Sequence, residues 1–517
     1  MRLKQNRMGR IASGISYLSL AILLTGCASL QPQPIKPAEQ KAIAAIDRQS
    51  AQADVEPLNA KLTLAEAIAR GLKYNLDHRT RMMEQALAIG QLDLSHFDLL
   101  PKILLDAGYD SRNNERITRS KDSVTGLPSL ANPYISSDRS HSTEGLGLAW
   151  NALDFGVSYF NAKQNADRVL VAAEHRRKAM HNLIRDVRTA YWRALSAQQL
   201  ASQLTETITL AESALQDARN IESEKVRDPL DALRYQRTVL ENLRILESIQ
   251  RELSAAHIEL AALINLPPGA NFELQEPLET ELTPAKRELS IERMEETAIA
   301  NNAELKEHFY NARIVVAETK KSLLRMFPNL SFNYGVKHDS DSYLIHNNWS
   351  EAGAQLSWNL LNLLSLPTVK RFNAANEKLA EERRIAAQMA LLAQVHLSRQ
   401  QYDSAYLMFR RADEIWQVDQ RIYQHISNRE QAQMKGHLDR VSDNTSAIVS
   451  LLRRYQALSE VYAALSKVEA TLGVEPAIGD LQSIKLDELK GIIEKALHDN
   501  WGAMETGATV KEQSAGT

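Results

Sequence analysis

Gly145-Leu146-Gly147-Leu148-Ala149-Trp150-Asn151 is the stretch that decides the architecture. Its large apolar side chains stand at every second position, which is the period of a β-strand with one apolar face. The pattern returns 208 positions later (353 − 145) as Gly353-Ala354-Gln355-Leu356-Ser357-Trp358-Asn359. The chain is therefore interpreted as two internal repeats that share one fold.

The match extends beyond this strand. At the same offset Leu230-Asp231 corresponds to Leu438-Asp439, and Pro268 corresponds to Pro476. Upstream, Asn75 matches Asn302, so the offset there is 227 (302 − 75), and the additional nineteen positions (227 − 208) fall in one polar loop. The sequence therefore predicts a first repeat at 62–268, a linker at 269–289, a second repeat at 290–476 and a C-terminal tail at 477–517.

Three other segments share the alternation of apolar and polar residues. The four predicted strands are 103–109, 146–150, 330–336 and 352–358, with polar loops at about 111–142 and 338–348. Apolar side chains on one face and polar ones on the other are typical of a transmembrane β-barrel. Four strands are too few to close a barrel, and a bilayer does not tolerate an open sheet edge. Either the strands form a soluble β-subdomain, or several chains share one barrel.

Long helices are predicted for the rest of each repeat. Thr63, with Glu66 three residues later, is typical of a helix N-cap, and this helix is expected to run to about Leu99. Neither Gly nor Pro interrupts 157–228, and the return segment at about 230–264 has apolar residues at steps of three and four, as coiled coils do. These stripes indicate helix packing and not a cofactor site. The two predicted seams are Leu246, Ile249, Leu253, Ala256, Leu260 and Leu263, and Ile448, Leu451, Tyr455, Leu458, Tyr462 and Leu465.

The N-terminus predicts export and a lipid anchor. Basic residues precede an apolar run at 11–24, which is typical of a secretory signal peptide. The run ends at Leu24-Thr25-Gly26-Cys27, which resembles the bacterial lipobox, and Cys27 is the chain's only cysteine. We therefore expect a signal peptide at 1–26 and palmitate on Cys27, and the alternative is an ordinary cleaved signal. The Pro- and Gln-rich residues 27–61 are interpreted as a tether, and the tail is expected to add one amphipathic helix at about 486–497.

Composition excludes several functions. With 61 Lys and Arg against 64 Asp and Glu, and with no basic block, nucleic acid is not expected as a partner. The chain has no Gly-rich phosphate loop, no nucleophile elbow and no paired metal-ligand motif, so we expect neither an enzyme nor a cofactor nor a metal site.

Several of these features together resemble the TolC-like outer-membrane efflux proteins. The resemblance rests on the lipobox, the Leu62-Thr63-Leu64 start followed by Asn75, the Pro101 and Pro328 helix stops, the Trp150 and Trp358 strand ends, and Leu472-Gly473. It implies an α+β membrane protein that forms a homotrimer. Four strands from each chain would make a shared twelve-stranded outer-membrane barrel, continuous with a long α-helical coiled-coil barrel in the periplasm.

The resemblance also implies roles for the periplasmic ends of the helical hairpins. The hairpin tips would contact a periplasmic adaptor protein, and an aspartate from each chain would narrow the pore and act as gate and cation filter. The corresponding tip residues here are Lys225, Val226, Arg227, Leu230, Lys435, Gly436 and Leu438, and the corresponding gate residues are Asp439, Asp231 and Asp443.

The expected function is an outer-membrane exit duct of a tripartite efflux or export system, which receives substrates from the adaptor and an inner-membrane pump. An alternative within transport is the outer-membrane component of type I protein secretion, which uses the same duct. From another class, the alternative is a periplasmic coiled-coil adaptor or structural lipoprotein. Such a protein is expected to have one hairpin flanked by soluble β-domains.

Overall fold

A computed structural model describes residues 34–506, apart from 59, 120, 129–132, 224–228, 268, 278, 288–289, 431–436, 477, 480 and 482. It contains two compact units, Met1–Val55 and Glu56–Thr517. The first unit holds α2 (Pro37–Gln52), in which no side chain is buried and Pro37 occupies the first helical turn. The sequence prediction of a tether did not include this helix of sixteen residues, which their Ala- and Gln-rich sequence favours.

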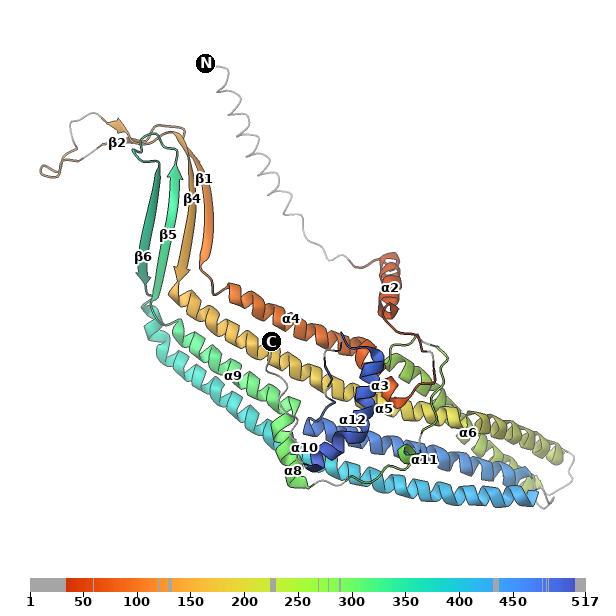
Figure 1. Cartoon of the computed structure of the whole chain (residues 1–517). Coiled ribbons are helices and arrows are strands. Elements are labelled where there is room, and N and C mark those ends of the chain that lie inside the picture. The colour runs from red at the N-terminus through yellow and green to blue at the C-terminus, as the bar shows by residue number, and fades with distance from the viewer. Residues whose placement is uncertain are drawn as a thin grey trace. The chain divides into compact units, whose positions relative to one another are not determined.

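The second unit contains a four-stranded antiparallel sheet at one end (Figure 1). Its order is β1 (Lys102–Ser111), β4 (Ser140–Asn151), β5 (Asn329–Asp339) and β6 (Asn348–Ser357). All four predicted strands are confirmed. The loop between β1 and β4 additionally contains a short antiparallel ribbon of β2 (Ile117–Thr118) and β3 (Tyr134–Ile135), which the sequence did not predict.

The predicted helix from Thr63 to about Leu99 is two helices. Thr63 caps α3 (Leu64–Tyr74) by accepting a hydrogen bond from the amide of Glu66 at 3.1 Å, as expected. The chain then leaves the helical conformation at Asn75, which caps a new helix, α4 (Leu76–Phe97). Asn302 separates α8 (Ile291–Asn301) from α9 (Ala303–Leu324) in the same way. The single-helix prediction was wrong because an asparagine side chain can replace the backbone bond that continues a helix.

Two very long helices extend from the sheet. α5 (Ala152–Ser223) has 72 residues and α10 (Leu361–Glu430) has 70, which at 1.5 Å per residue makes each roughly 105–110 Å long. Return helices α6 (Pro229–Leu263) and α11 (His437–Leu472) run back from the far end (Figure 1). The short α7 (Glu279–Leu282) lies in the linker, and α12 (Leu486–Thr506) confirms the helix predicted for the tail.

The helices of this unit form a layer in which α5 and α10 run through both halves. Next to the sheet the neighbours follow the order α4, α5, α9, α10; beyond the middle, α6 and α11 take the places of α4 and α9. Leu200 and Leu204 of α5 pack there against α6 and α11 in one buried cluster. The first predicted seam is confirmed from Leu246 to Leu260, whereas the second buries Leu452 where Leu451 was expected. Within the described part of the chain, none of the helices combines the length and apolar character needed to cross a membrane.

Candidate channel-forming surfaces

One face of the sheet is apolar and exposed. Residues paired across an antiparallel ladder project to the same face, so the register assigns each row to a side. One row joins Ile103, Leu148, Tyr334 and Ala352, and the next joins Leu105, Leu146, Val336 and Ser350. The large apolar side chains in these rows are exposed to solvent. Each strand is 10 to 12 residues long, which matches the 9–11 residues of a transmembrane β-strand.

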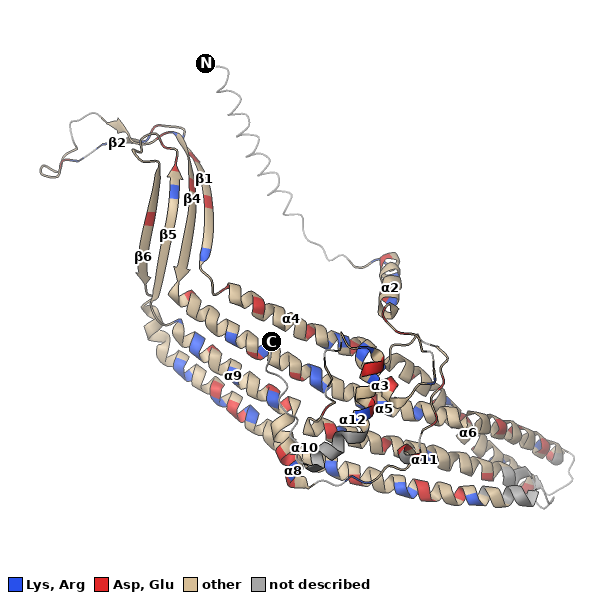
Figure 2. Cartoon of the chain, in the orientation of Figure 1, with Lys and Arg blue, Asp and Glu red and all other residues tan. Residues whose placement is uncertain are grey.

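The opposite face of the sheet is polar and rich in glycine. Its rows include Asp106, Gly145 and Lys337, and Lys337 Nζ lies 2.7 Å from Oε1 of Glu351 on β6. The Asp106 carboxylate lies flat over Gly145, within 2.6 Å of where a Cβ would be. A larger residue at this position would displace the carboxylate. Figure 2 shows how few charges the sheet carries compared with the helices.

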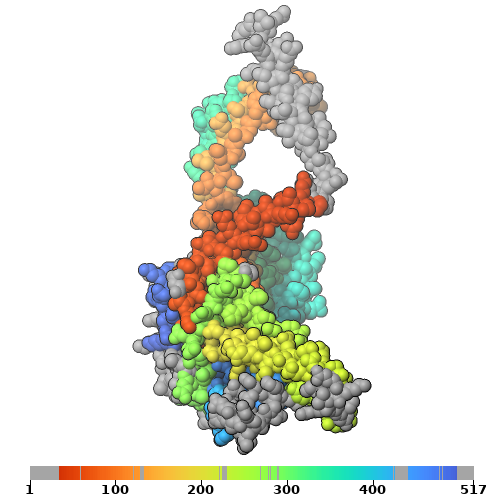
Figure 3. All heavy atoms as spheres, turned by 90° about the vertical axis from the view of Figure 1, so that its right-hand side faces the viewer, coloured from red at the N-terminus to blue at the C-terminus, as the bar shows by residue number. Residues whose placement is uncertain are grey.

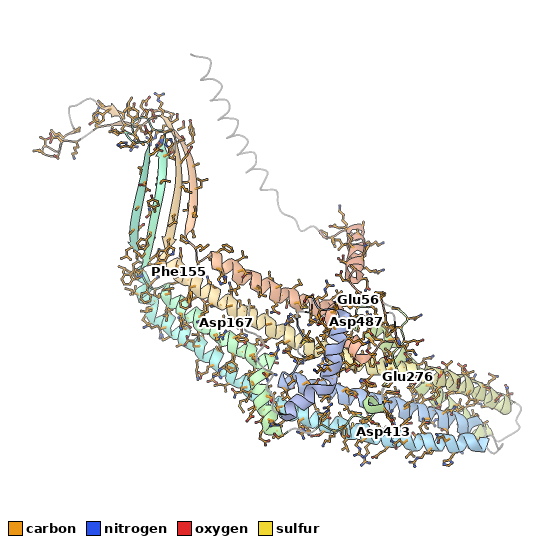
Figure 4. The ribbon with its side chains drawn as sticks, in the orientation of Figure 1. Glu56, Phe155, Asp167, Glu276, Asp413 and Asp487 are labelled. Carbon is orange, nitrogen blue, oxygen red and sulfur yellow. The ribbon has the colours of Figure 1, made fainter. Side chains whose placement is uncertain are left out.

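Aromatic side chains mark the end of the sheet nearest the helices. Trp150 stacks on Phe332 with ring centroids 5.8 Å apart and tilts against Phe155, which lies at this junction in Figure 4. Trp358 donates its indole N–H to the carbonyl of Met326 at 3.0 Å. Amphipathic rings of this kind are enriched where a transmembrane barrel meets the membrane interface.

The two lateral edges of this unit are open and differ from each other. In the part of the chain that is described, β1 and β6 each have a strand partner on one side only. At the β1 edge, α4 exposes apolar residues at heptad spacing: Leu76, Met83, Leu87, Leu94 and Phe97. At the β6 edge, α10 exposes a comparable series: Phe372, Leu379, Ile385, Met389, Leu397, Leu407, Met408, Ile415, Val418 and Ile422.

Asparagines join the helices end to end at mid-length. Asn75 caps α4 through its Oδ1, which accepts from the amide of His78, and its Nδ2 donates to the carbonyl of Leu263 in the last turn of α6 at 3.0 Å. Asn302 makes the equivalent bonds, to the amide of Leu305 and to the carbonyl of Thr471 near the end of α11. Each side chain therefore satisfies a helix N-terminus and a helix C-terminus at once.

Arg177 of α5 is the centre of a largely buried ionic cluster beside the second joint, the one at Asn302. Its guanidinium contacts the carboxylates of Glu174 at 2.5 Å and Glu475 at 2.9 Å and donates to the carbonyls of Asn301 and Gly473 at 3.2 Å each. Burial raises the pKa of Glu174, although the charge of Arg177 opposes this.

The neighbouring His181 is neutral at physiological pH. Burial, together with the positive charge of Arg177, lowers the pKa of the His181 imidazole to about 4. Its Nε2 lies 3.6 Å from Glu475, and with a neutral ring this contact is not an ion pair. The Glu475 carboxylate therefore depends on Arg177 for charge compensation.

The linker is attached to the helices at several points. The Tyr462 hydroxyl donates to the carbonyl of Glu281 at 2.8 Å, and Arg454 donates to the carbonyl of Leu282 while contacting Asp413 of α10 at 2.5 Å. Asp413 is labelled on the lower part of α10 in Figure 4. In the space-filling view, the yellow-to-green stretch that includes α6 and the linker lies on the surface of this unit (Figure 3).

Neither a known family model nor a curated protein matches the sequence. Solved structures do. The Campylobacter jejuni CmeC outer membrane channel matches with a TM-score of 0.61 and 12% identity over 85% of this chain and 89% of CmeC. The outer-membrane channel OprN matches with a TM-score of 0.59 and 16% identity over 80% and 90% of the two chains. The Vibrio cholerae outer membrane protein VceC matches with a TM-score of 0.58 and 12% identity over 80% and 97%.

This chain has the fold of the TolC-like outer-membrane channels. The resemblance inferred from the sequence is thereby confirmed for the fold. The fold includes both the sheet, with its apolar and polar faces and its open edges, and the long helices.

The predicted gate and tip residues are only partly described. Asp231 stands exposed on the first turn of α6, with its Oδ1 3.8 Å from Nη1 of Arg234, and Leu230 beside it is also exposed. Asp443 lies half-buried on α11. The first turn of α11 includes Leu438 and Asp439, but their side chains lie outside the described residues. So do Cys27 and the tip residues Lys225, Val226, Arg227, Lys435 and Gly436.

The structure does bring the two hairpins together near their tips. Val239 of α6, Val441 of α11 and Ala211 of α5 belong to one buried cluster. Asp231 and Asp443 therefore come from helices that begin at the same end of this unit.

Sequence reasoning missed the joints and the Arg177 cluster. The signal for the joints was present, because Asn75 and Asn302 are equivalent positions of the predicted repeat. Nothing in the sequence singles out Arg177, whose partner Glu475 lies 298 residues away.

Proposed function

We propose that this chain is the outer-membrane exit duct of a tripartite efflux or export system. The observation that carries the proposal is the sheet, which exposes a continuous apolar face and keeps a polar face opposite. Within the described residues, each of its two edge strands is paired on one side only. In a bilayer the apolar face would contact lipid and the polar face would line water. The open edges would then pair with other copies of the chain, because a spanning sheet must close on itself.

Closure requires copies that join head to tail. The β1 edge with α4 differs from the β6 edge with α10, and a contact between unlike surfaces forms a ring when its rotation closes. We infer a homotrimer with a twelve-stranded barrel, by similarity to the TolC-like proteins, in which the two halves of each chain act as internal repeats. The heptad stripe on α4 would pack against the sheet-proximal members of the apolar series on α10 of the neighbouring copy, beginning at Phe372. The helices would continue the pore into the periplasm, toward an adaptor protein and an inner-membrane pump.

Conductance across a planar bilayer tests the duct. The purified full chain in detergent is expected to have the mass of a trimer and to produce discrete channels of one size. A preparation that is monomeric and does not conduct contradicts the proposal and favours the periplasmic adaptor or structural lipoprotein.

Asp439 is proposed to line the closed end of the pore, with Asp231 and Asp443 nearby and the hairpin tips contacting the adaptor. A ring of like charges attracts cations and resists ionisation. Asp439→Ala is therefore expected to raise single-channel conductance at neutral pH or to weaken the block by divalent cations. Glu241→Ala, which removes an exposed carboxylate of α6 farther from the tip, provides the control. Unchanged conductance and block in Asp439→Ala remove this residue from the gate.

Cys27 is proposed to carry the lipid anchor. Replacing it by serine removes the thiol that acylation requires, so Cys27→Ser is expected to abolish incorporation of labelled palmitate. Equal labelling of the variant and the wild-type chain rules out Cys27 as the lipidation site.

A further inference from the structure

The β2–β3 ribbon projects from the end of the sheet that lies away from the helices (Figure 1). It belongs to the segment 112–139, which contains five basic residues, Arg112, Arg116, Arg119, Lys121 and Arg139, against three acidic ones. The equivalent connection between β5 and β6, 340–347, has one aspartate and neither Lys nor Arg. The positive charge is therefore specific to the longer loop, in a chain whose net charge is −3.

All three acidic residues of the segment already have partners. Glu115 binds Arg139 at 2.5 Å. Asp122 closes a turn, with its carboxylate accepting from the amides of Val124 at 2.7 Å and Thr125 at 3.0 Å. Asp138 accepts from the amide of Ser342 at 2.6 Å.

Four cations of the segment are left without a carboxylate. Among the described residues, none places an acidic oxygen within ion-pairing distance of Arg112, Arg116, Arg119 or Lys121. All four side chains are exposed. Their charges are therefore available to a partner outside this chain.

Apolar side chains are interleaved with these cations. Ile117 and Ile135 are paired across the ribbon and both exposed, and Val124 at the turn is 92% exposed. A surface that combines basic and apolar side chains in this way is typical of segments that lie at an anionic membrane interface.

The base of the ribbon is held rigidly against the sheet. Asp341, in the β5–β6 loop, accepts from the hydroxyl of Ser137 at 2.7 Å and from the amide of Asp138 at 3.1 Å. The amide of Ser342, in the same β5–β6 loop, donates in turn to the carboxylate of Asp138. The ribbon is thereby presented at a fixed position beside the ends of the strands.

We propose that the ribbon binds the phosphate groups of the phosphorylated glycolipids that surround the barrel in the outer leaflet. The inference rests on the proposed function, because the sheet must span the outer membrane to bring the ribbon to that surface. Four unpaired cations complement the anionic phosphates, and the exposed isoleucines and Val124 contact the acyl boundary.

Lipid binding by the full-length protein tests this assignment. Wild-type protein in neutral detergent is mixed with phosphatidylcholine vesicles with and without lipid A, and bound protein is measured after flotation. The triple variant Arg116→Gln, Arg119→Gln, Lys121→Gln is compared with Arg234→Gln, Arg237→Gln, Arg244→Gln, which removes the same charge from exposed positions of α6. At about 1 kcal/mol per basic residue, the ribbon variant is expected to lose affinity for lipid A by about a hundredfold. The α6 variant is expected to bind as wild type does.

The following results overturn the inference. They are equal binding of the wild-type protein to both vesicles, undiminished lipid A binding by the ribbon variant, and an equal loss in both variants. A ribbon variant that changes conductance but not lipid A binding places the ribbon at the channel mouth and likewise refutes the assignment. Conductance is recorded in the same preparation. If the protein forms channels but does not prefer vesicles with lipid A, this inference is refuted and the proposed duct function still stands.

Discussion

Tyr334→Arg should abolish the proposed outer-membrane trimer, whereas Asn333→Arg should leave it intact. The two positions are adjacent on β5, but the register places Tyr334 in the apolar row with Leu148 and Asn333 in a polar row with Gly353. An arginine that faces lipid near mid-bilayer costs about 2–4 kcal/mol, and a ring of identical chains incurs this cost in each copy. An arginine on the water-filled side costs little.

The measurement is the amount of heat-dissociable trimer in the outer-membrane fraction. The pair is matched in strand, depth and introduced charge, so only the face of the sheet differs. Equal amounts of trimer for the two variants contradict the assignment of the apolar face to lipid.

Arg177→Ala should lower the local stability of the helical layer at mid-length, where α11 ends beside Asn302. The substitution leaves the carboxylates of Glu174 and Glu475 together in a site where the arginine side chain is only 14% exposed. It also removes the donors to the carbonyls of Asn301 and Gly473. Breaking one side of a buried ion pair costs about 3–5 kcal/mol, so amide hydrogen exchange in the last turn of α11 is expected to accelerate by about a hundredfold or more.

Two further variants separate charge from position. Arg177→Lys keeps the charge but cannot reach several partners at once, so we expect an intermediate effect. Arg185→Ala removes a half-exposed arginine of the same helix that pairs with Asp186, and exchange should not change. An Arg177→Ala variant with wild-type protection at α11 would show that the cluster does not hold the joint.

The sequence predicts the sheet well because each strand carries its own signal. Alternation places Leu146, Leu148 and Trp150 on one face before any pairing is known, and the register confirms it. The helical seam from Leu246 to Leu260 is equally local. These patterns are periodic, so a few neighbouring residues are enough to detect them.

Contacts between distant segments were beyond sequence reasoning. The bond from Asn75 to Leu263, 188 residues away, is such a contact. The cap that Asn75 forms with the amide of His78 is local, and its repetition at Asn302 was a signal that the sequence did contain. The helix in the N-terminal segment was missed because its few apolar residues indicate the absence of a core and do not exclude local helix. The prediction for Asp439 rests on its equivalence to Asp231 and on the family resemblance, neither of which fixes where its carboxylate lies.

The difference between the β1 edge and the β6 edge predicts which mutations are genetically dominant. In a ring of head-to-tail copies, a chain with a damaged β6 edge still presents a sound β1 edge and therefore still joins one neighbour. It occupies a place in the assembly but prevents the last join. When a cell makes both normal and edge-mutant chains, even a minority of mutant chains would inactivate complexes made mostly of normal subunits. Mutations at an edge should therefore be dominant over the normal copy. Mutations that unfold the whole chain should be recessive.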